Sequence, residues 1–334
     1  LQSASAAFTP TFQATIPDVL PEERDYTKAL ALSRLAYDME SLTSPMLAAA
    51  LLTVINFHWL FSGTAVGFVG SAILVLSTTL PRALNRKEVR TGIYAKTTRG
   101  MRIYLKTPRL RGLLALTFAS AAASSMVIVN TVVIVRDQLG LGQRDVAFTL
   151  AAFGGGSILA ALGLPRILDR ISDRSIMITA AAVLAWGLAI MGALTHWFGS
   201  SSNYWSILLA GWFVLGMAYS MSVTPSGRLL KRSANAEDRP ALFAAQFALS
   251  HGSWLICYPL AGQLGARENQ VMTFIAMSII AHFGVIAAYL LWPSADPDEL
   301  PHDHVDLDAD HPHLRDKHGQ SAGHAYVIDD LHQH

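Results

Sequence analysis

Charged residues are scarce in this chain: Asp, Glu, Lys and Arg make up 15% of its 334 residues, against about 25% in soluble domains. Cysteine is nearly absent, and the single Cys257 excludes a disulfide within the chain and a metal site built from several cysteines. The sequence also lacks a glycine-rich phosphate loop of the Walker type and a nucleophile–base constellation, so we do not expect an enzyme. Instead, 52% of the residues are hydrophobic, which predicts a membrane protein.

The charge that is present gathers between residues 81 and 111. This segment holds ten Lys and Arg residues and a single acid, Glu88, while apolar segments end at Leu80 and restart at Leu113. By the positive-inside rule, a basic segment between two membrane-length segments lies in the cytoplasm. A nucleic-acid-binding linker is the alternative, but the flanking sequence does not have the composition of a soluble domain. The cytoplasmic assignment fixes the orientation of every other segment, because each crossing reverses the side.

Eight segments are long and apolar enough to span a bilayer, which takes about 20 residues. They are residues 27–55, 57–80, 113–135, 146–168, 176–197, 204–224, 241–264 and 271–292. Loops predicted to face outward hold only three basic residues, Arg136, Arg144 and Arg267, so the charge bias alternates correctly across all eight spans. The predicted fold is an all-α, multi-pass membrane protein whose C-terminus lies in the cytoplasm.

The sequence also contains an internal repeat. A Thr-Pro pair at residues 9–10 returns at 224–225, and an acid-acid-Arg triplet at 22–24 returns at 237–239, both after 215 residues. A proline follows each triplet inside the next span, Pro45 in the first case and Pro259 in the second. Repeated halves with the substrate path between them are typical of secondary transporters.

On these features the chain resembles the major facilitator superfamily of secondary transporters. In that family two six-helix halves are joined by a basic cytoplasmic linker, and a cytoplasmic loop of each half carries the pattern G-x-x-x-D-R-x-G-R. Residues 165–174 resemble this pattern at Asp169, Arg170 and Arg174. They depart from it at Pro165, Ser172 and Asp173.

A second pattern of the family, G-x-x-x-G-P-x-x-G-G, is similar to residues 40–49, where Pro45 is kept, Glu40 replaces the first glycine and small residues replace the others. The resemblance implies that the eight spans are helices 5 to 12 of a major-facilitator-like helical bundle. It divides the chain into a remnant of the N-terminal half-bundle (1–80), a basic cytoplasmic linker (81–112), a C-terminal six-helix half-bundle (113–292) and a His/Asp-rich disordered tail (293–334). Because the sequence starts without methionine and mid-pattern, we expect that a preceding segment has been lost.

Three ionisable residues lie in the first span: Arg34, Asp38 and Glu40. Ionisable residues within membrane spans are costly and usually functional. The four-residue spacing also brings Arg34 within reach of Asp38 for an ion pair. We regard these residues as candidates for proton coupling or for binding a cationic substrate. In the alternative, they pair at the lipid headgroups.

Other polar residues within the spans are weaker candidates for the transport path. They are Asn130, His251 and His282. A polar side chain in a span more often forms an interhelical hydrogen bond than a ligand contact. The resemblance further implies that the gating motif of the family comprises Asp169, Arg170, Arg174 and Pro45.

Eight of the twelve histidines lie after residue 293, interleaved with aspartates. Closely spaced His pairs can share a nickel, zinc or copper ion. The candidate metal ligands are His302, His304, His311, His313 and His318. The tail resembles the histidine-rich tails of nickel-resistance exporters in the superfamily. The alternative is a solvated acidic tail with incidental histidines, and we expect no other cofactor.

Two transport functions follow from the sequence. The first is proton-coupled efflux of a small organic molecule, and the alternative is export of a divalent metal (nickel, cobalt or zinc) with the tail as a cytoplasmic metal collector. A receptor or scaffold without transport is a third class. We expect a monomer in the plasma (inner) membrane, in contact with the lipid bilayer and a small-molecule or metal-ion substrate, and without a nucleic-acid partner.

Overall fold

The computed structural model describes residues 2–51, 54–77, 93–267, 269–296, 299–301, 323–325 and 327. Most of these residues are helical. The elements are α1 (Gln2–Val19), α2 (Glu23–Leu51), α3 (Phe57–Ser77), α4 (Ile93–Lys106), α5 (Pro108–Val132), the π-helix η1 (Val133–Gln138), α6 (Gln143–Leu168), α7 (Asp173–Phe198), α8 (Tyr204–Val223), α9 (Ser226–Arg232), α10 (Arg239–Arg267), α11 (Gln270–Leu291), β1 (Glu299–Pro301) and β2 (Gly323–Ala325).

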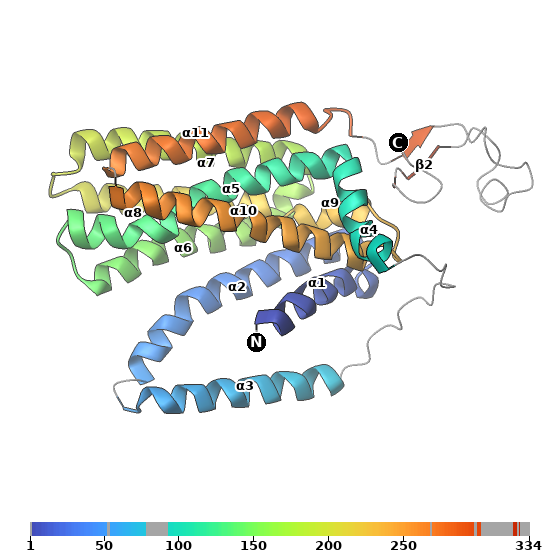
Figure 1. The fold of residues 1–334 in the computed structure, drawn as a ribbon, viewed down its shortest axis with the longest axis horizontal. Helices are drawn as coiled ribbons and strands as arrows, with labels where there is room; N and C mark the ends of the chain where they lie inside the picture. Colours follow the sequence, from blue (N-terminus) through green and yellow to red (C-terminus); the bar gives the residue numbers. More distant parts are fainter. Residues whose placement is uncertain are drawn as a thin grey trace, which may run out of the picture.

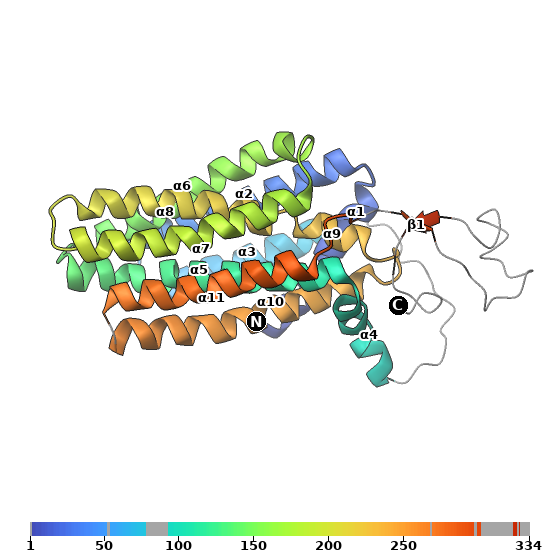
Figure 2. The same cartoon turned by 90° about the horizontal axis from the view of Figure 1, so that it is seen from above.

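The long helices run side by side (Figure 1). α5, α6, α7, α8, α10 and α11 form one bundle, which we call the C-terminal bundle, and α2 packs along it through α6. α1 lies against α10, and α3 lies at the edge of the molecule, where nearly all of its described side chains are exposed. α4 crosses one end of the C-terminal bundle (Figure 2). We call this end, which also carries α9 and the turn between α1 and α2, the linker end.

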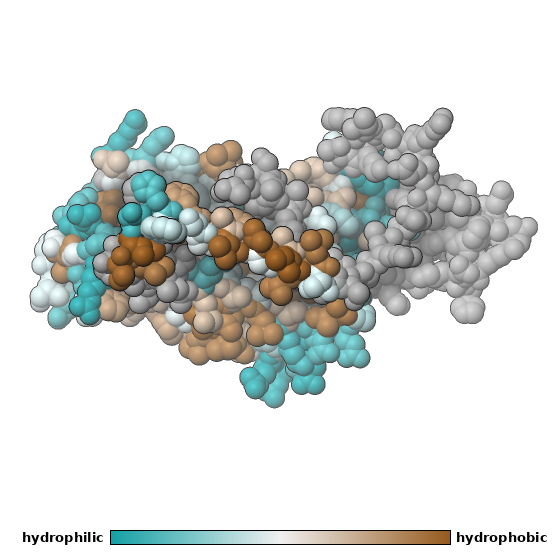
Figure 3. All heavy atoms as spheres, turned by 90° about the horizontal axis from the view of Figure 1, so that it is seen from below, coloured by the Kyte–Doolittle hydropathy of each residue, from teal (hydrophilic) through white to brown (hydrophobic). Residues whose placement is uncertain are grey.

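Five helical stretches among the described residues are long and apolar enough to cross a membrane. They are Pro108–Gln138, Gln143–Leu168, Asp173–Phe198, Tyr204–Arg232 and Gln270–Leu291. A multi-pass helical membrane bundle is therefore confirmed. The other three predicted spans correspond to α2, α3 and α10, which fall outside this set. On the face drawn in Figure 3, apolar residues (brown) run along the middle of the molecule and hydrophilic residues (teal) gather toward its margins.

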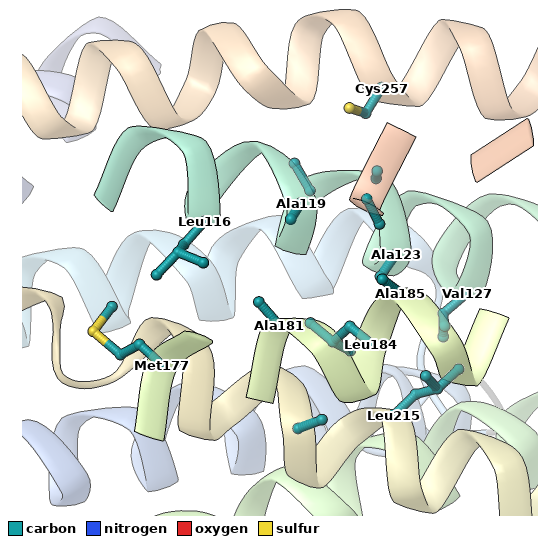
Figure 4. Close-up of a cluster of buried hydrophobic side chains, with 14 of the residues drawn as sticks. Leu116, Ala119, Ala123, Val127, Met177, Ala181, Leu184, Ala185, Leu215 and Cys257 are labelled. Atoms are coloured by element: carbon teal, nitrogen blue, oxygen red, sulfur yellow. The ribbon is translucent and has the colours of Figure 1, made fainter. Parts of the chain in front are cut away.

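Small side chains allow α5 to lie at the centre of the C-terminal bundle. Every residue from Ala119 to Ser125 is buried, and four core positions of α5 follow helical spacing at Leu116, Ala119, Ala123 and Val127. They meet a matching row on α7, which includes Met177 and Leu184 (Figure 4). Close packing of small residues is how helices associate where lipid supplies no hydrophobic driving force.

Glycines bring the backbones of α6 and α8 into direct contact. A Cβ atom added at Gly156 would lie 2.0 Å from the carbonyl oxygen of Phe213, and one at Gly216 would lie 1.9 Å from the carbonyl oxygen of Phe153. The two helices therefore form a rigid pair, and the side chain that follows Gly156 on α6 is held in a fixed position.

The described part of the basic linker is helical. Within the predicted 81–112 segment, α4 packs on α10, where Arg99 binds Asp238 with N–O distances of 2.6 and 3.0 Å. The Tyr104 hydroxyl donates to Gln246 Oε1, and burial raises the pKa of this hydroxyl above its ordinary value, so it stays protonated. The described part of the linker is thus fastened to the C-terminal bundle.

The structure also differs from the prediction at the start of the third span and within the tail. The span expected to begin at Leu113 starts at Pro108, because proline suits the first helical position and the charge of Arg109 is neutralised by Asp296 at 3.3 Å. In the tail predicted to be disordered, β1 and β2 form a short antiparallel pair in which Leu300 lies opposite His324. The metal-ligand candidates His302, His304, His311, His313 and His318 lie outside the described residues.

The helices reproduce the internal repeat. α2 and α10 both contain 29 residues, and each end of α10 lies 216 positions after the matching end of α2. α3 and α11 follow them with 21 and 22 residues. Equal lengths at nearly the same offset as the sequence repeat support the interpretation of two related halves.

Candidate functional site

Arg34 and Asp38 form a buried ion pair on α2. The guanidinium donates from Nε to Asp38 Oδ2 at 3.1 Å and from Nη2 to Asp38 Oδ1 at 2.6 Å. Only 15% of the Arg34 side chain and 5% of the Asp38 side chain are exposed. Two parallel hydrogen bonds between a guanidinium and a carboxylate are among the strongest polar contacts in proteins. The ion pair expected from the four-residue spacing is therefore present.

Ser157 of α6 joins this pair to the C-terminal bundle. Its hydroxyl donates to Asp38 Oδ2 at 2.5 Å and accepts a longer bond from Arg34 Nε at 3.3 Å. Ser157 is completely buried and directly follows Gly156, which fixes α6 against α8. The contact therefore connects α2 to the closely packed helices α6 and α8 of the C-terminal bundle.

The pair lies deep within the bundle. Arg34 follows the first residue of α2 by 11 positions, and Ser157 precedes the last residue of α6 by 11 positions. At 1.5 Å per residue, both lie about 16 Å from the ends of their helices.

Aromatic rings enclose the guanidinium of Arg34. Its central carbon lies 5.3 Å from the ring centroid of Tyr37 on α2 and 4.9 Å from that of Tyr219 on α8. The electron-rich ring faces attract the cation and shield it from its surroundings. Glu40 is exposed and, two residues after Asp38, extends from a different side of α2. The structure thus separates two carboxylates that the sequence leaves equivalent.

A second group of charges lies at the linker end. Asp173 Oδ1 is 3.0 Å from Arg228 Nε, and its other oxygen is 4.0 Å from Arg232 Nη2. Arg228 also pairs with Glu23 and donates to Thr27 Oγ1 at 2.7 Å. Since Glu23 and Thr27 belong to α2, Arg228 links the first half of the chain to α7 and α9.

The turn between α1 and α2 is held by two more contacts. Arg239 Nη1 lies 2.8 Å from Asp18 Oδ1, and Lys231 Nζ donates to the carbonyl oxygen of Pro21 at 2.6 Å. Together with the contacts of Arg228, these bonds form what we call the linker-end latch. α2 is therefore fixed to the C-terminal bundle at two levels, the latch at one end and Ser157 near the middle.

The family comparison agrees with this architecture. Residues 1–197 and residues 113–315 each match the family model of the Major Facilitator Superfamily. The chain belongs to the major facilitator superfamily. It is a membrane transporter and not an enzyme. Residues 113–197 are covered by both matches, which agrees with two halves that resemble each other. A search of curated protein sequences gave no match.

Of the residues that match the superfamily loop pattern, Arg174 forms hydrogen bonds to another helix, whereas Asp169 and Arg170 are exposed. Asp169 and Arg170 are exposed in the turn between α6 and α7. Arg174 donates to the carbonyl oxygens of Trp292 at 3.0 Å and Tyr289 at 3.4 Å, so it fastens the end of α11. Asp173, a departure from the pattern, is the acid that pairs with Arg228.

The remaining polar candidates, Asn130, His282 and His251, each contact other residues of the C-terminal bundle. Asn130 is buried on α5 and donates to the carbonyl oxygen of Ala261 on α10 at 3.1 Å, an interhelical hydrogen bond. His282 packs edge-on against Trp186 at 4.7 Å between α11 and α7. His251 is exposed on α10, with Nδ1 2.8 Å from the carbonyl oxygen of Phe247 in its own helix.

The predicted gating and metal sites include residues whose side chains the structure does not describe. Pro45 falls within the bounds of α2, but the structure does not describe its side chain. Within the described ranges, no group of three or more His, Cys, Asp or Glu residues could hold a metal ion. The tail histidines therefore stay a prediction from the sequence.

Sequence reasoning missed Ser157, Asp173 and Asp296 as members of these networks. Asp296 receives Arg232 at 3.4 Å and the indole N–H of Trp292 at 3.0 Å, in addition to Arg109. A buried acid at the start of a helix next to a predicted arginine cluster could have indicated Asp173. A serine within a span gives no comparable signal, because most such serines bond to their own backbone.

Proposed function

We propose that this transporter exports a small organic molecule in exchange for protons, and that Asp38 carries the proton. The observation that supports this most directly is the buried Arg34–Asp38–Ser157 contact between α2 and α6. Ionisable residues within membrane spans are rare, usually pair with one another and usually mark substrate or proton pathways. The superfamily works by relative movement of two halves, and this contact joins them.

The exchange follows from the charge of Asp38. While Asp38 is ionised, it holds Arg34 and accepts from Ser157, so α2 stays against α6. A proton on Asp38 removes the negative charge that binds the guanidinium, and the hydrogen bonds become weaker neutral ones. Movement of α2 away from α6 then costs less. Protonation and substrate release would alternate, because each favours a different arrangement of the two halves.

The test compares Asp38→Asn with Glu40→Gln in reconstituted vesicles. A tolerance profile of cells expressing the protein first identifies an exported compound among organic toxins. Its flux is then measured across vesicles under an imposed pH gradient. We expect Asp38→Asn to reduce flux at least about tenfold and to remove its dependence on the gradient, since asparagine cannot exchange a proton. Glu40→Gln serves as the control, because Glu40 is exposed. Equal flux in wild type and Asp38→Asn would reject the proposal.

The proposal includes an orientation in the plasma membrane. The basic linker, the linker end and the tail are assigned to the cytoplasm by the positive-inside rule, and residues 200–203 to the outside. Arg102→Cys and Ser202→Cys provide exposed labelling positions on opposite ends of the bundle. Cys257 is buried and can be replaced by serine as background. A membrane-impermeant thiol reagent should label position 202 in intact cells, and labelling at position 102 instead would reverse the orientation.

Metal export is a second candidate, favoured by the eight histidines of the tail. Such a tail would bind nickel, cobalt or zinc at several modest sites next to the transport path. The structure sharpens the test, because Asp296 must be kept to hold Arg109 and Arg232. A chain that ends after Asp298 should lose metal tolerance and keep tolerance to organic toxins if the tail collects metal. Unchanged metal tolerance would favour export of an organic molecule.

A further inference from the structure

α10 carries a stripe of aromatic rings at the margin of the core, where Trp254 packs against it. The stripe follows the helical spacing of four, three and four residues at Phe247, His251, Trp254 and Tyr258. Phe247, Trp254 and Tyr258 are half-buried and His251 is exposed, whereas Trp212, a core ring on α8, is fully buried. A stripe of rings that serves only core packing would be buried like Trp212.

The rings of this stripe contact one another. Trp254 and Tyr258 are stacked, with ring centroids 4.9 Å apart and an angle of 27° between their planes. Nearer the linker end, Phe247 and His251 lie 4.0 Å apart. Trp254 and Tyr258 thus form a stack of two rings one helical turn apart on α10, to which a planar molecule could add.

Ring-to-ring contacts continue from α10 to the ion pair. Trp254 lies edge-on to Tyr219 of α8 at 6.5 Å, and Tyr219 lies 5.6 Å from Phe153 of α6. Tyr219 also covers the guanidinium of Arg34. We call Phe153, Tyr219, Trp254 and Tyr258 the aromatic wall. It joins three helices of the C-terminal bundle and ends at Arg34, the ion-pair partner of Asp38.

The charge beside the aromatic wall is balanced. Arg34 and Asp38 neutralise each other, and Glu40 extends from another side of α2. Among the described residues of α10, His251 lies one helical turn before Trp254 and is a further ionisable side chain near the wall. A bound cation would face Arg34 and a bound anion would face Asp38. The wall therefore favours molecules that stack on rings without a net charge.

We propose that the aromatic wall is a binding subsite for flat aromatic molecules without net charge. The proposal rests on the proposed function and names its class of substrate. The molecule would stack on Trp254 and Tyr258, and the hydroxyl of Tyr258 could bond its polar groups. A molecule bound against Tyr219 would lie next to Arg34, so Arg34 would respond both to the bound molecule and to the charge of Asp38.

The test measures binding of three planar fluorescent probes to the purified full chain at pH 8. An uncharged coumarin, cationic ethidium and anionic fluorescein are titrated and followed by fluorescence anisotropy. We expect the coumarin to bind most tightly. Trp254→Leu should weaken its binding about tenfold, since a lost stacking contact is worth about one order of magnitude. Trp254→Phe keeps a ring and should restore most of the affinity.

Trp186→Leu is the matched control, because Trp186 is 61% exposed on α7 and lies outside the wall. Equal effects of Trp186→Leu and Trp254→Leu would overturn the subsite, and tighter binding of either charged probe would overturn the class of ligand. A melting curve of each variant separates lost binding from lost folding.

The two proposals fail in different ways. Coumarin binding that depends on Trp254, without pH-driven transport of any compound, would reject proton exchange and leave the subsite. Proton-driven transport without an effect of Trp254→Leu on binding would reject the subsite alone.

Discussion

α10 and α11 are consecutive helices of the C-terminal bundle, yet their exposed faces differ. α11 exposes apolar side chains at helical spacing and is apolar enough to cross a membrane: Ile275, Ile279, Phe283, Ile286 and Leu290. α10 is longer, at 29 residues against 22, but it carries His251 and Tyr258 and does not reach that composition. α2, which holds Arg34 and Asp38, does not reach it either.

The difference shows where polarity is tolerated in a membrane helix. α2 holds the ion pair, and α10 reaches it through the contact of Trp254 with Tyr219 of α8. Because lipid does not satisfy polar groups, a polar side chain within a span needs a partner or a path. The low hydropathy of α2 and α10 is what the proposed transport path beside them would require.

The largest effect is expected in the linker-end latch. Asp173→Asn removes one partner of a buried ion pair, which costs about 3–5 kcal/mol when the other charge stays buried. The variant should melt at a lower temperature in detergent and lose transport. Asp169→Asn is the control, since Asp169 is exposed and such changes stay within about 0.5 kcal/mol. A larger effect of Asp169→Asn would show that Asp169, as the family pattern predicts, is the important acid of this loop and would contradict the role of Asp173.

A smaller effect is expected where α10 packs on α5. A Cβ atom at Gly265 would lie 1.8 Å from Asn130 Oδ1, whereas one at Gly252 on the same helix would meet nothing within 4 Å. Gly265→Ala should therefore destabilise the protein by about 1–3 kcal/mol, the usual cost of overpacking. Gly252→Ala should be neutral or slightly stabilising, because alanine favours a helix. Thermal melts of the two variants that coincide would contradict the two-faced description of α10.

The smallest effect compares a histidine from each helix. His251 lies on the ring stripe of α10, and His282 packs against Trp186 between α11 and α7. His251→Leu should reduce the flux of a transported compound about threefold, because one ring contact is lost. His282→Leu should leave the flux unchanged within error. The reverse order would place the path on α11.

Some of this arrangement was predictable from the sequence. The four-residue spacing predicted the pairing of Arg34 with Asp38, and the 215-residue repeat anticipated the equal lengths of α2 and α10. Both signals are local or periodic, so they survive without knowledge of packing. The basic segment before α5 was also recognisable, although its folding into α4 on α10 was not.

Other parts depend on contacts between distant segments. Ser157 reaches Asp38 only because Gly156 lets α6 approach α8, and a serine in a span carries no sign of that role. Asp173 becomes buried because α9 places Arg228 above it, so the family pattern pointed to the exposed Asp169 instead. The different surroundings of Asp38 and Glu40 follow from the rotation of α2 against α6, which the sequence does not define.

The central claim is that the Arg34–Asp38 pair couples transport to protons and does not merely hold the fold. The most direct test is the double variant Arg34→Gln/Asp38→Asn, measured beside Asp38→Asn. Asp38→Asn leaves Arg34 buried without its partner and should lower the melting temperature. The double variant removes both charges, so the melting temperature should recover while pH-driven flux stays lost. Recovery of pH-driven flux together with the melting temperature would contradict the account.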